Sequence, residues 1–365
     1  MSATQELTPR SRLTLRVRRD VAVDQVMLRA VRYRPAPDPA LVARTEAEVA
    51  AALAAWQATP WAHDPAAYHR DPPAPAGVRE RRTRSGGIRY THLSWPDEYE
   101  VREGEPGAER YAGYRHNRIA RLSLLEHRDD RPWVLCIHGF GMGSEGADLR
   151  AFRGMHLHRR FGLNVAFVTL PFHGRRKADR GPLPKVPGID LLDTLHALEQ
   201  ATWDVRQAMH LLRSRTDESI GLMGLSLGGG VAGCVASVDE PDAVILLIPA
   251  VDLASLMVDA ATEMGEAADH LDLFEQSRRL LAPVSPLALT PRVPVERRAI
   301  VAGTLDKFAR PSSQAGALSR HWDDPVTHWY HGGHVSMFWS PRAKRSIDAS
   351  LAHVGLLTSH PHPRG

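Results

Sequence analysis

The sequence has 365 residues, of which 43% are hydrophobic and 24% are charged, and its formal net charge is +4. These values are ordinary for a globular protein, and the length allows one large α/β domain or a domain with an extension. The basic residues are interleaved with acidic ones along the chain, which argues against a nucleic-acid partner. Two arginine clusters, at 10–19 and 79–87, leave contact with an anionic surface open as a minor hypothesis.

The N-terminus and the cysteines indicate a compartment. The first 20 residues lack the apolar core of a secretory signal, and no apolar run approaches the roughly 18 residues of a membrane span. Cys136 and Cys234 lie in apolar stretches, so we expect two buried free thiols and no disulfide. We therefore expect a cytoplasmic protein without a membrane span.

Residues 1–87 are predicted to be an extension of the main domain. They contain basic and proline-rich stretches and one good helix candidate at 39–58, which has Pro39 near its start and an apolar stripe at helical spacing. Nothing in this region indicates chemistry. We expect it to lie over the core of the protein.

From residue 88 onward the pattern predicts a sheet. Two alternating segments suggest antiparallel strands, and they are followed by continuous apolar runs that alternate with helical stretches. These segments are, in order, 88–95, 118–127, 133–139, 163–171, 219–224, 243–249 and 297–303. The pattern predicts an α/β domain over 88–365, with an open, mostly parallel sheet covered by helices on both faces. In such sheets ligands bind beyond the carboxyl ends of the strands.

Residues 253–290 interrupt this alternation with helical material rich in methionine and leucine. Two interpretations stay open. The segment is either a small cap over the site or a crossover helix with extra turns.

The most informative motif is Gly224-Leu225-Ser226-Leu227-Gly228, which fits G-x-S-x-G. It lies between a short apolar run and a helix-forming stretch. A serine hydroxyl is a poor nucleophile unless it is exposed near a base and near donors for an oxyanion. A tight strand-to-helix turn exposes it in this way, and such a turn needs small flanking residues. We therefore expect Ser226 to be a catalytic nucleophile, whereas the alternative is a glycine-rich turn with an incidental serine.

A second motif, "HGFGMG" at 138–143, directly follows a buried strand. A small-residue loop at this place can aim a backbone N–H at the oxygen of a tetrahedral intermediate. We predict that the N–H groups of Phe140 and Leu227 form the oxyanion hole.

The predicted acid is Asp306, after a late strand, and the predicted base is His334, before a terminal helix. With Ser226 they follow the chain order nucleophile, acid, base. Asp252, which ends an earlier strand, is a weaker candidate for the acid, and His331 is the fallback for the base.

Other histidines and the cysteines carry weaker signals. His328, His331 and His334 are three residues apart, but intervening glycines and the absence of an H-E-x-x-H or paired-cysteine motif disfavour a metal site. His173 is expected near the rim of the same site, where local hydrogen bonding is the more favoured role. The cysteines are disfavoured as nucleophiles because burial raises a thiol pKa.

These motifs together resemble the α/β-hydrolase superfamily. The resemblance covers roughly residues 88–365 and depends on "HGFG", "GLSLGG", "GTLD" and "GGHVS" in this order. It implies a serine hydrolase with a Ser226–Asp306–His334 triad, no cofactor, no metal and a small-molecule acyl substrate. A serine at the nucleophile position disfavours the branches that use aspartate or cysteine there.

We therefore predict hydrolysis of a carboxylic ester or related acyl bond through an acyl-enzyme on Ser226. An acyltransferase with the same triad and a peptidase stay open, and a non-catalytic binding module is the least favoured alternative.

Overall fold

The computed structural model describes residue 9 and residues 14–32, 38–85, 87–177, 184–264 and 271–357. Within these residues nine strands form one sheet in the order β1-β2-β3-β5-β4-β6-β7-β8-β9. The strands are β1 (Arg79–Ser85), β2 (Ile88–Pro96), β3 (Ile119–Leu125), β4 (Trp133–Ile137), β5 (Asn164–Val168), β6 (Ile220–Leu225), β7 (Ala243–Leu247), β8 (Arg298–Gly303) and β9 (Val326–Tyr330). The pairs from β1 to β5 along one edge are antiparallel, and all pairs from β5 to β9 are parallel.

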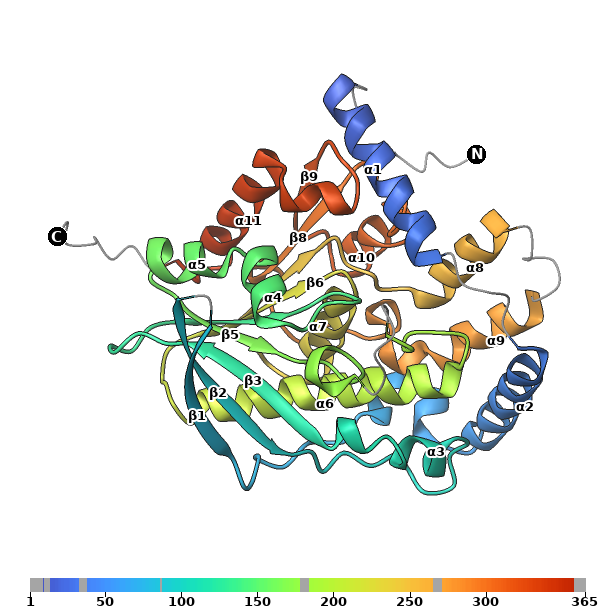
Figure 1. Ribbon diagram of the computed structural model, residues 1–365. Coiled ribbons are helices and arrows are strands. Elements are labelled where there is room, and N and C mark those ends of the chain that lie inside the picture. Colours follow the sequence, from blue (N-terminus) through green and yellow to red (C-terminus); the bar gives the residue numbers. More distant parts are fainter. Residues whose placement is uncertain are drawn as a thin grey trace.

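The sheet lies between two layers of helices (Figure 1). Successive residues of the central strands face opposite layers, as in Leu222 and Met223 of β6, and both side chains are fully buried. The helices are α1 (Leu15–Arg32), α2 (Pro39–Trp56), α3 (Ala108–Ala112), α4 (Glu145–Ala151), α5 (Gly154–Phe161), α6 (Leu191–Arg213), α7 (Leu227–Val238), α8 (Leu253–Met264), α9 (Leu271–Leu280), α10 (Ala315–His321) and α11 (Pro341–His353). The core on one face includes α6 and α7, and that on the other includes α5 and α11.

The predicted open, mostly parallel α/β sheet is confirmed, and each of the seven predicted strands is present. The two edge strands, β1 and β9, were not predicted. β1 has the sequence RERRTRS and is largely exposed. Charged side chains protect an edge strand from pairing with another chain, but they also remove the alternation of apolar and polar residues by which a strand is predicted. The second basic cluster, at 79–87, is therefore mostly a sheet edge that pairs with β2.

The N-terminal segment 1–87 contains more structure than the single predicted helix. The helix at 39–58 is confirmed as α2, which contacts α6 and α9. A further helix, α1, was missed because its first turn belongs to the arginine cluster at 10–19, which was interpreted only as a basic run. Part of the first arginine cluster, residues 10–13, lies outside the described residues. The domain boundary at residue 87 stays a prediction.

The segment 253–290 is helical, as predicted. It contains α8, α9 and two short 3-10 turns, η6 (Ala282–Val284) and η7 (Pro286–Ala288), while residues 265–270 lie outside the described residues. Helix α9 packs against α2 and α8. Whether the segment acts as a cap or as a crossover stays a prediction.

Candidate active site

Ser226 occupies the turn between β6 and α7, with a φ of 54° and a ψ of −113°. A serine pays a conformational cost in this region, so the surrounding structure must hold it there. Its backbone N–H donates to the carbonyl of Leu247 at 2.9 Å, and its carbonyl accepts from the N–H of Ala250 at 3.0 Å. These bonds fasten the turn to β7 and to the loop that follows β7.

The glycines beside Ser226 are required by space. A Cβ on Gly224 would collide with the carbonyl of Gly228, and a Cβ on Gly228 would collide with the carbonyls of Ile137 and His138. Helix α7 therefore begins in direct backbone contact with the end of β4. This close approach brings the loop after β4 next to Ser226.

His334 links Ser226 to Asp306. Its Nδ1 lies 2.7 Å from Asp306 Oδ2, and its Nε2 lies 3.0 Å from Ser226 Oγ. Because a carboxylate only accepts hydrogen bonds, Nδ1 carries the proton and Nε2 accepts from the Ser226 hydroxyl. The other oxygen of Asp306 accepts from the N–H groups of Phe308 and Ala309, both at 2.8 Å. The structure thus brings the three predicted site residues into one hydrogen-bonded chain.

The electrostatic surroundings favour a charged imidazole. Burial by itself lowers the pKa of His334, but the Asp306 carboxylate, together with that of Asp24, outweighs this effect and raises the pKa above its ordinary value. An imidazole in such a setting readily accepts a proton and holds it.

The loop after β4 contacts the serine turn. A Cβ on Gly139 would lie 3.4 Å from Ser226 Cβ. The loop is held by Asp148, which accepts from Gly143 N–H at 3.1 Å, and by His138 Nε2, which accepts from Leu170 N–H at 3.1 Å. This second contact makes His138 a neutral acceptor, in agreement with its pKa, which burial lowers to about 3.

The two predicted oxyanion donors lie on the segments that meet at this point. Leu227 is the first residue of α7, where backbone N–H groups have no acceptor within the helix. Phe140 follows Gly139 and packs its ring edge-on against His173. The role of these two N–H groups stays a prediction.

The weaker candidates have other partners. The Asp252 carboxylate accepts from Ser255 N–H at 2.9 Å and from Arg278 Nη1 at 2.8 Å. His328 lies on β9 and His331 follows that strand, whereas the histidine that bonds to both Ser226 and Asp306 is His334. Within the described residues no three histidine, cysteine or acidic side chains are grouped as metal ligands.

His173 and the cysteines are buried. His173 Nδ1 lies 2.8 Å from the carbonyl of Pro171, which is the local bonding expected for it, and burial lowers its pKa to about 4. Cys136 and Cys234 are free thiols whose pKa values burial raises.

No described helix combines the length and the apolar character that crossing a membrane requires.

One contact to this site has no precursor in the sequence motifs. Asp24, on α1, accepts hydrogen bonds from the backbone N–H groups of His334 and Val335, the latter at 2.8 Å. Nothing in the sequence of this basic helix predicts that one of its aspartates contacts the site.

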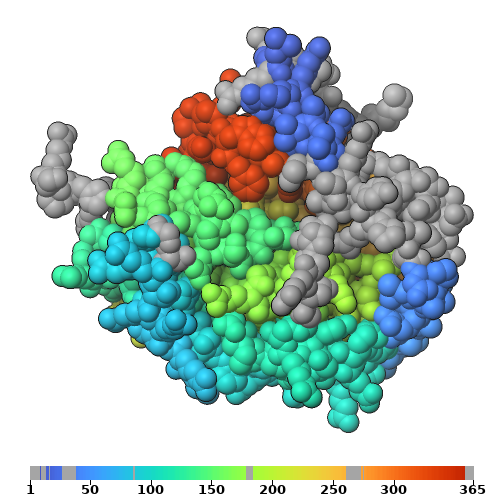
Figure 2. Space-filling view, in the orientation of Figure 1, coloured from blue at the N-terminus to red at the C-terminus, as the bar shows by residue number. Residues whose placement is uncertain are grey.

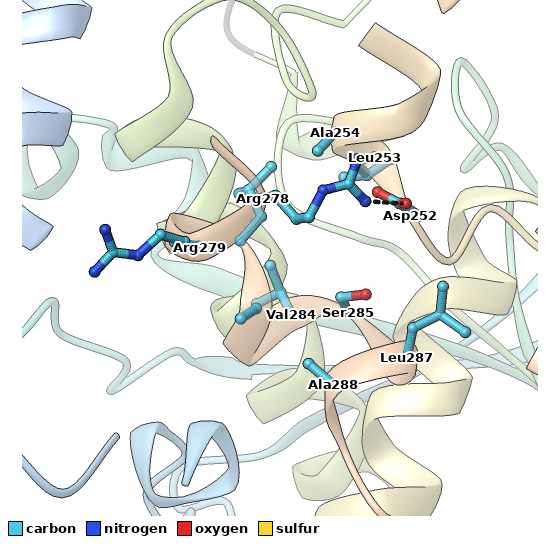
Figure 3. A pocket seen from close by; sticks show the side chains of 11 residues that line it. Asp252, Leu253, Ala254, Arg278, Arg279, Val284, Ser285, Leu287 and Ala288 are labelled. Atoms are coloured by element: carbon cyan, nitrogen blue, oxygen red, sulfur yellow. Dashed lines mark hydrogen bonds and ion pairs between the residues drawn. The ribbon is translucent and has the colours of Figure 1, made fainter. Parts of the chain in front are cut away.

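A cavity of about 320 Å³ lies between the start of α8, the end of α9 and the 3-10 turns η6 and η7 (Figure 3). Its lining is mostly apolar, and Arg278 points across it to Asp252, whereas Arg279 points away. Leu253 and Val284 line both this cavity and a much smaller hollow beside Leu227 and Ala250. Neither hollow is lined by Ser226, Asp306 or His334.

Comparison with known proteins gives a relative and a fold. No model of a known protein family matches the chain. An uncharacterized protein of Mycobacterium tuberculosis, Rv2627c in strain ATCC 25618 / H37Rv and MT2702 in strain CDC 1551 / Oshkosh, is 35% identical over 359 residues, which cover 96% of this chain and 85% of that protein. An acetyl xylan esterase from Paenibacillus sp. R4 superimposes with a TM-score of 0.54 over 90% of this chain and 99% of its own, at 16% identity. The fold is that of the α/β-hydrolases, as the motifs predicted.

Proposed function

Because the chain belongs to the same family as the uncharacterized Mycobacterium tuberculosis protein and has the α/β-hydrolase fold, we propose that it is a serine hydrolase of carboxylic esters or related acyl compounds. The observation that carries this proposal is the chain of hydrogen bonds from Ser226 through His334 to Asp306. A buried glycine-rich turn without a catalytic role would not need a serine in a strained conformation bonded to a histidine.

The first half of the reaction forms an acyl-enzyme. His334 Nε2 takes the proton of the Ser226 hydroxyl as Oγ attacks the substrate carbonyl carbon, and it then gives that proton to the leaving alkoxide. Asp306 holds the imidazole in the tautomer with the proton on Nδ1 and stabilises its charged form. In the second half water attacks the carbonyl carbon of the ester on Ser226 while His334 takes a proton from the water. His334 then gives that proton to Oγ, which leaves as the hydroxyl as the carboxylic acid is released.

The negative oxygen of each tetrahedral intermediate needs donors. We assign this role to the N–H groups of Leu227 and Phe140, because the segments that carry them meet beside Ser226. The positive end of the α7 dipole adds to the same effect. One such donor contributes a factor of about 100 to 1,000 in rate.

A panel of p-nitrophenyl esters of increasing acyl length, with a thioester and an aminoacyl amide included, tests the proposal. We expect ester hydrolysis by the wild type and its loss in Ser226→Ala. The matched control is Ser237→Ala, since Ser237 is a buried serine of α7 whose hydroxyl bonds only to the carbonyl of Gly233 at 2.9 Å. Equal activity of the wild type and Ser226→Ala would contradict the proposal, and transfer to added alcohols in place of water would identify an acyltransferase.

A further inference from the structure

The N-terminal helix α1 contacts the loop that carries His334. It packs against the short 3-10 turn η9 (Val335–Phe338), which begins immediately after His334. Figure 1 shows α1 beside β9 and α11, and Figure 2 shows its blue atoms against the red C-terminal part of the surface. This helix is remote in sequence from the other site residues.

Two aspartates on α1 make the contact. The Asp24 carboxylate, which is 1% exposed, accepts from the N–H groups of both His334 and Val335. One turn earlier, Asp20 accepts from the indole Nε1 of Trp339 at 3.2 Å. Asp24 therefore holds the start of η9, and Asp20 holds its far end.

The loop is shaped to receive the Asp24 carboxylate. A Cβ on Gly333 would overlap with Asp24 Oδ2, so this position has room for Asp24 only when it is a glycine. The same loop is fixed from the other side, because Tyr330 donates its hydroxyl to the Gly333 carbonyl at 2.8 Å and Ser336 Oγ accepts from Gly333 N–H at 2.9 Å. The N–H groups of the next two residues, His334 and Val335, donate instead to Asp24 on the α1 side.

Burying this carboxylate is costly. Burial raises the pKa of Asp24 to about 6, although the N–H group of Val335 offsets part of the effect and the Asp306 charge adds to it. A costly buried charge that accepts from the backbone N–H groups of His334 and Val335 indicates a role in the loop that carries His334.

We propose that Asp24 is a positioning residue for His334: it holds the backbone of the imidazole-bearing loop, so that Nε2 lies within hydrogen-bond distance of Ser226. The proposal rests on the proposed hydrolase function. It makes α1 a component of the active-site assembly. The carboxylate also stabilises the charged form of His334, in addition to Asp306.

The titratable groups that face Asp24 are Asp306, His334 and Tyr330, together with Asp20 on its own helix. Above pH 6 Asp24 is ionised, and its charge raises the pKa of His334. Removing the charge lowers the pKa of His334, so activity reaches its plateau at a lower pH.

The test compares Asp24→Asn with the matched control Asp20→Asn, in the full-length chain. Asparagine is close in size to aspartate, but its NH2 group replaces one of the two oxygens, each of which accepts from one N–H group. We expect Asp24→Asn to lower kcat by about tenfold to a hundredfold, because small displacements of a reacting group cost this much, with KM within about twofold of the wild type. The midpoint of its pH profile should move to lower pH. Asp20→Asn should match the wild type in all three measurements, because the asparagine oxygen can still accept from Trp339 Nε1.

Unchanged kcat and pH midpoint in Asp24→Asn, or an equal loss in Asp20→Asn, would overturn the proposal. Amide hydrogen exchange of residues 331–339 gives a readout that needs no activity, and we expect faster exchange in Asp24→Asn than in the wild type. If the wild type hydrolyses no acyl substrate, the proposed function fails, and the exchange measurement alone decides. Faster exchange in Asp24→Asn then supports positioning by Asp24, and unchanged exchange refutes it.

Discussion

The Asp24 carboxylate fills the space that a Cβ on Gly333 would occupy. A residue of the first described helix and a residue of the histidine loop are thus fitted to each other across more than 300 positions of sequence. The contact makes α1 part of the proposed active-site assembly. It can be tested by substitution of Gly333 as well as of Asp24.

Gly333→Ala should displace Asp24 and move the loop that carries His334. We expect a loss in kcat of about tenfold or more, for the same reason as in Asp24→Asn. Steady-state kinetics of Gly333→Ala, Asp24→Asn and the double variant measure this. The two losses should be far from additive, because each variant breaks the same contact; simple multiplication of the two effects would show that the residues act separately.

Asp306→Asn should lose far more activity than Asp252→Asn. Replacing the acid of a Ser-His-Asp triad by asparagine favours the wrong imidazole tautomer and costs a factor of about 10,000 in kcat. Asp252 instead bonds to Ser255 and Arg278, so its loss should change kcat by less than about tenfold. The reverse ranking of the two kcat values would make Asp252 the acid.

The activity should rise with pH through the pKa of His334. The base must be neutral to accept the Ser226 proton, and its pKa lies above the ordinary value of 6.5. The acid limb of kcat/KM should therefore have its midpoint above pH 6.5, and activity should fall as the imidazole becomes charged below that point. A kcat/KM that stays constant down to pH 5 would exclude His334 as the base.

Gly228→Ala should destabilise the fold, because the new methyl group would meet the carbonyls of Ile137 and His138. Backbone carbonyls cannot rotate away as a side chain can, so we expect a loss of about 1–3 kcal/mol in the free energy of unfolding. Gly146→Ala on α4 is the control, since only the Arg150 side chain lies within 4 Å of its Cβ. Urea denaturation of both variants measures the difference, and equal stability would argue against the close packing of α7 on β4.

Arg176→Met should lower the free energy of unfolding by about 3–5 kcal/mol, because it leaves buried carboxylates without their partner. The guanidinium is fully buried, bonds to Asp97 at 2.8 Å and to Asp204, and also donates to the Asn117 carbonyl at 2.6 Å. The free energy of unfolding of Arg176→Lys should lie between those of the wild type and Arg176→Met, since an ammonium cannot make the same set of bonds. Urea denaturation gives the ranking, and a loss below about 1 kcal/mol for Arg176→Met would show that the carboxylates are protonated without it.

Much of this account could be predicted from the sequence because the relevant signals are local. Continuous apolar runs marked the strands that are buried on both faces, and the glycines around Ser226 marked a turn with no space for side chains. Asp306 could be found because it follows a predicted strand at the edge of the sheet where ligands bind, and His334 because it follows two glycines just before the terminal helix.

The rest depends on contacts between distant segments. β1 was missed because an exposed edge strand can consist of charged residues, and α1 was missed because its start lies in the arginine cluster at 10–19. Asp24 could not be predicted at all: its partners are backbone N–H groups, which every residue carries, and they lie more than 300 positions away. Only the fold brings them together.

The most direct test of the central claim is the intact mass of the protein after reaction with a fluorophosphonate, followed by peptide mapping. We predict a single adduct on Ser226 in the wild type and in Ser237→Ala, and none in Ser226→Ala. An adduct that persists in Ser226→Ala, or a folded wild type that forms no adduct, would contradict the assignment of Ser226 as the nucleophile.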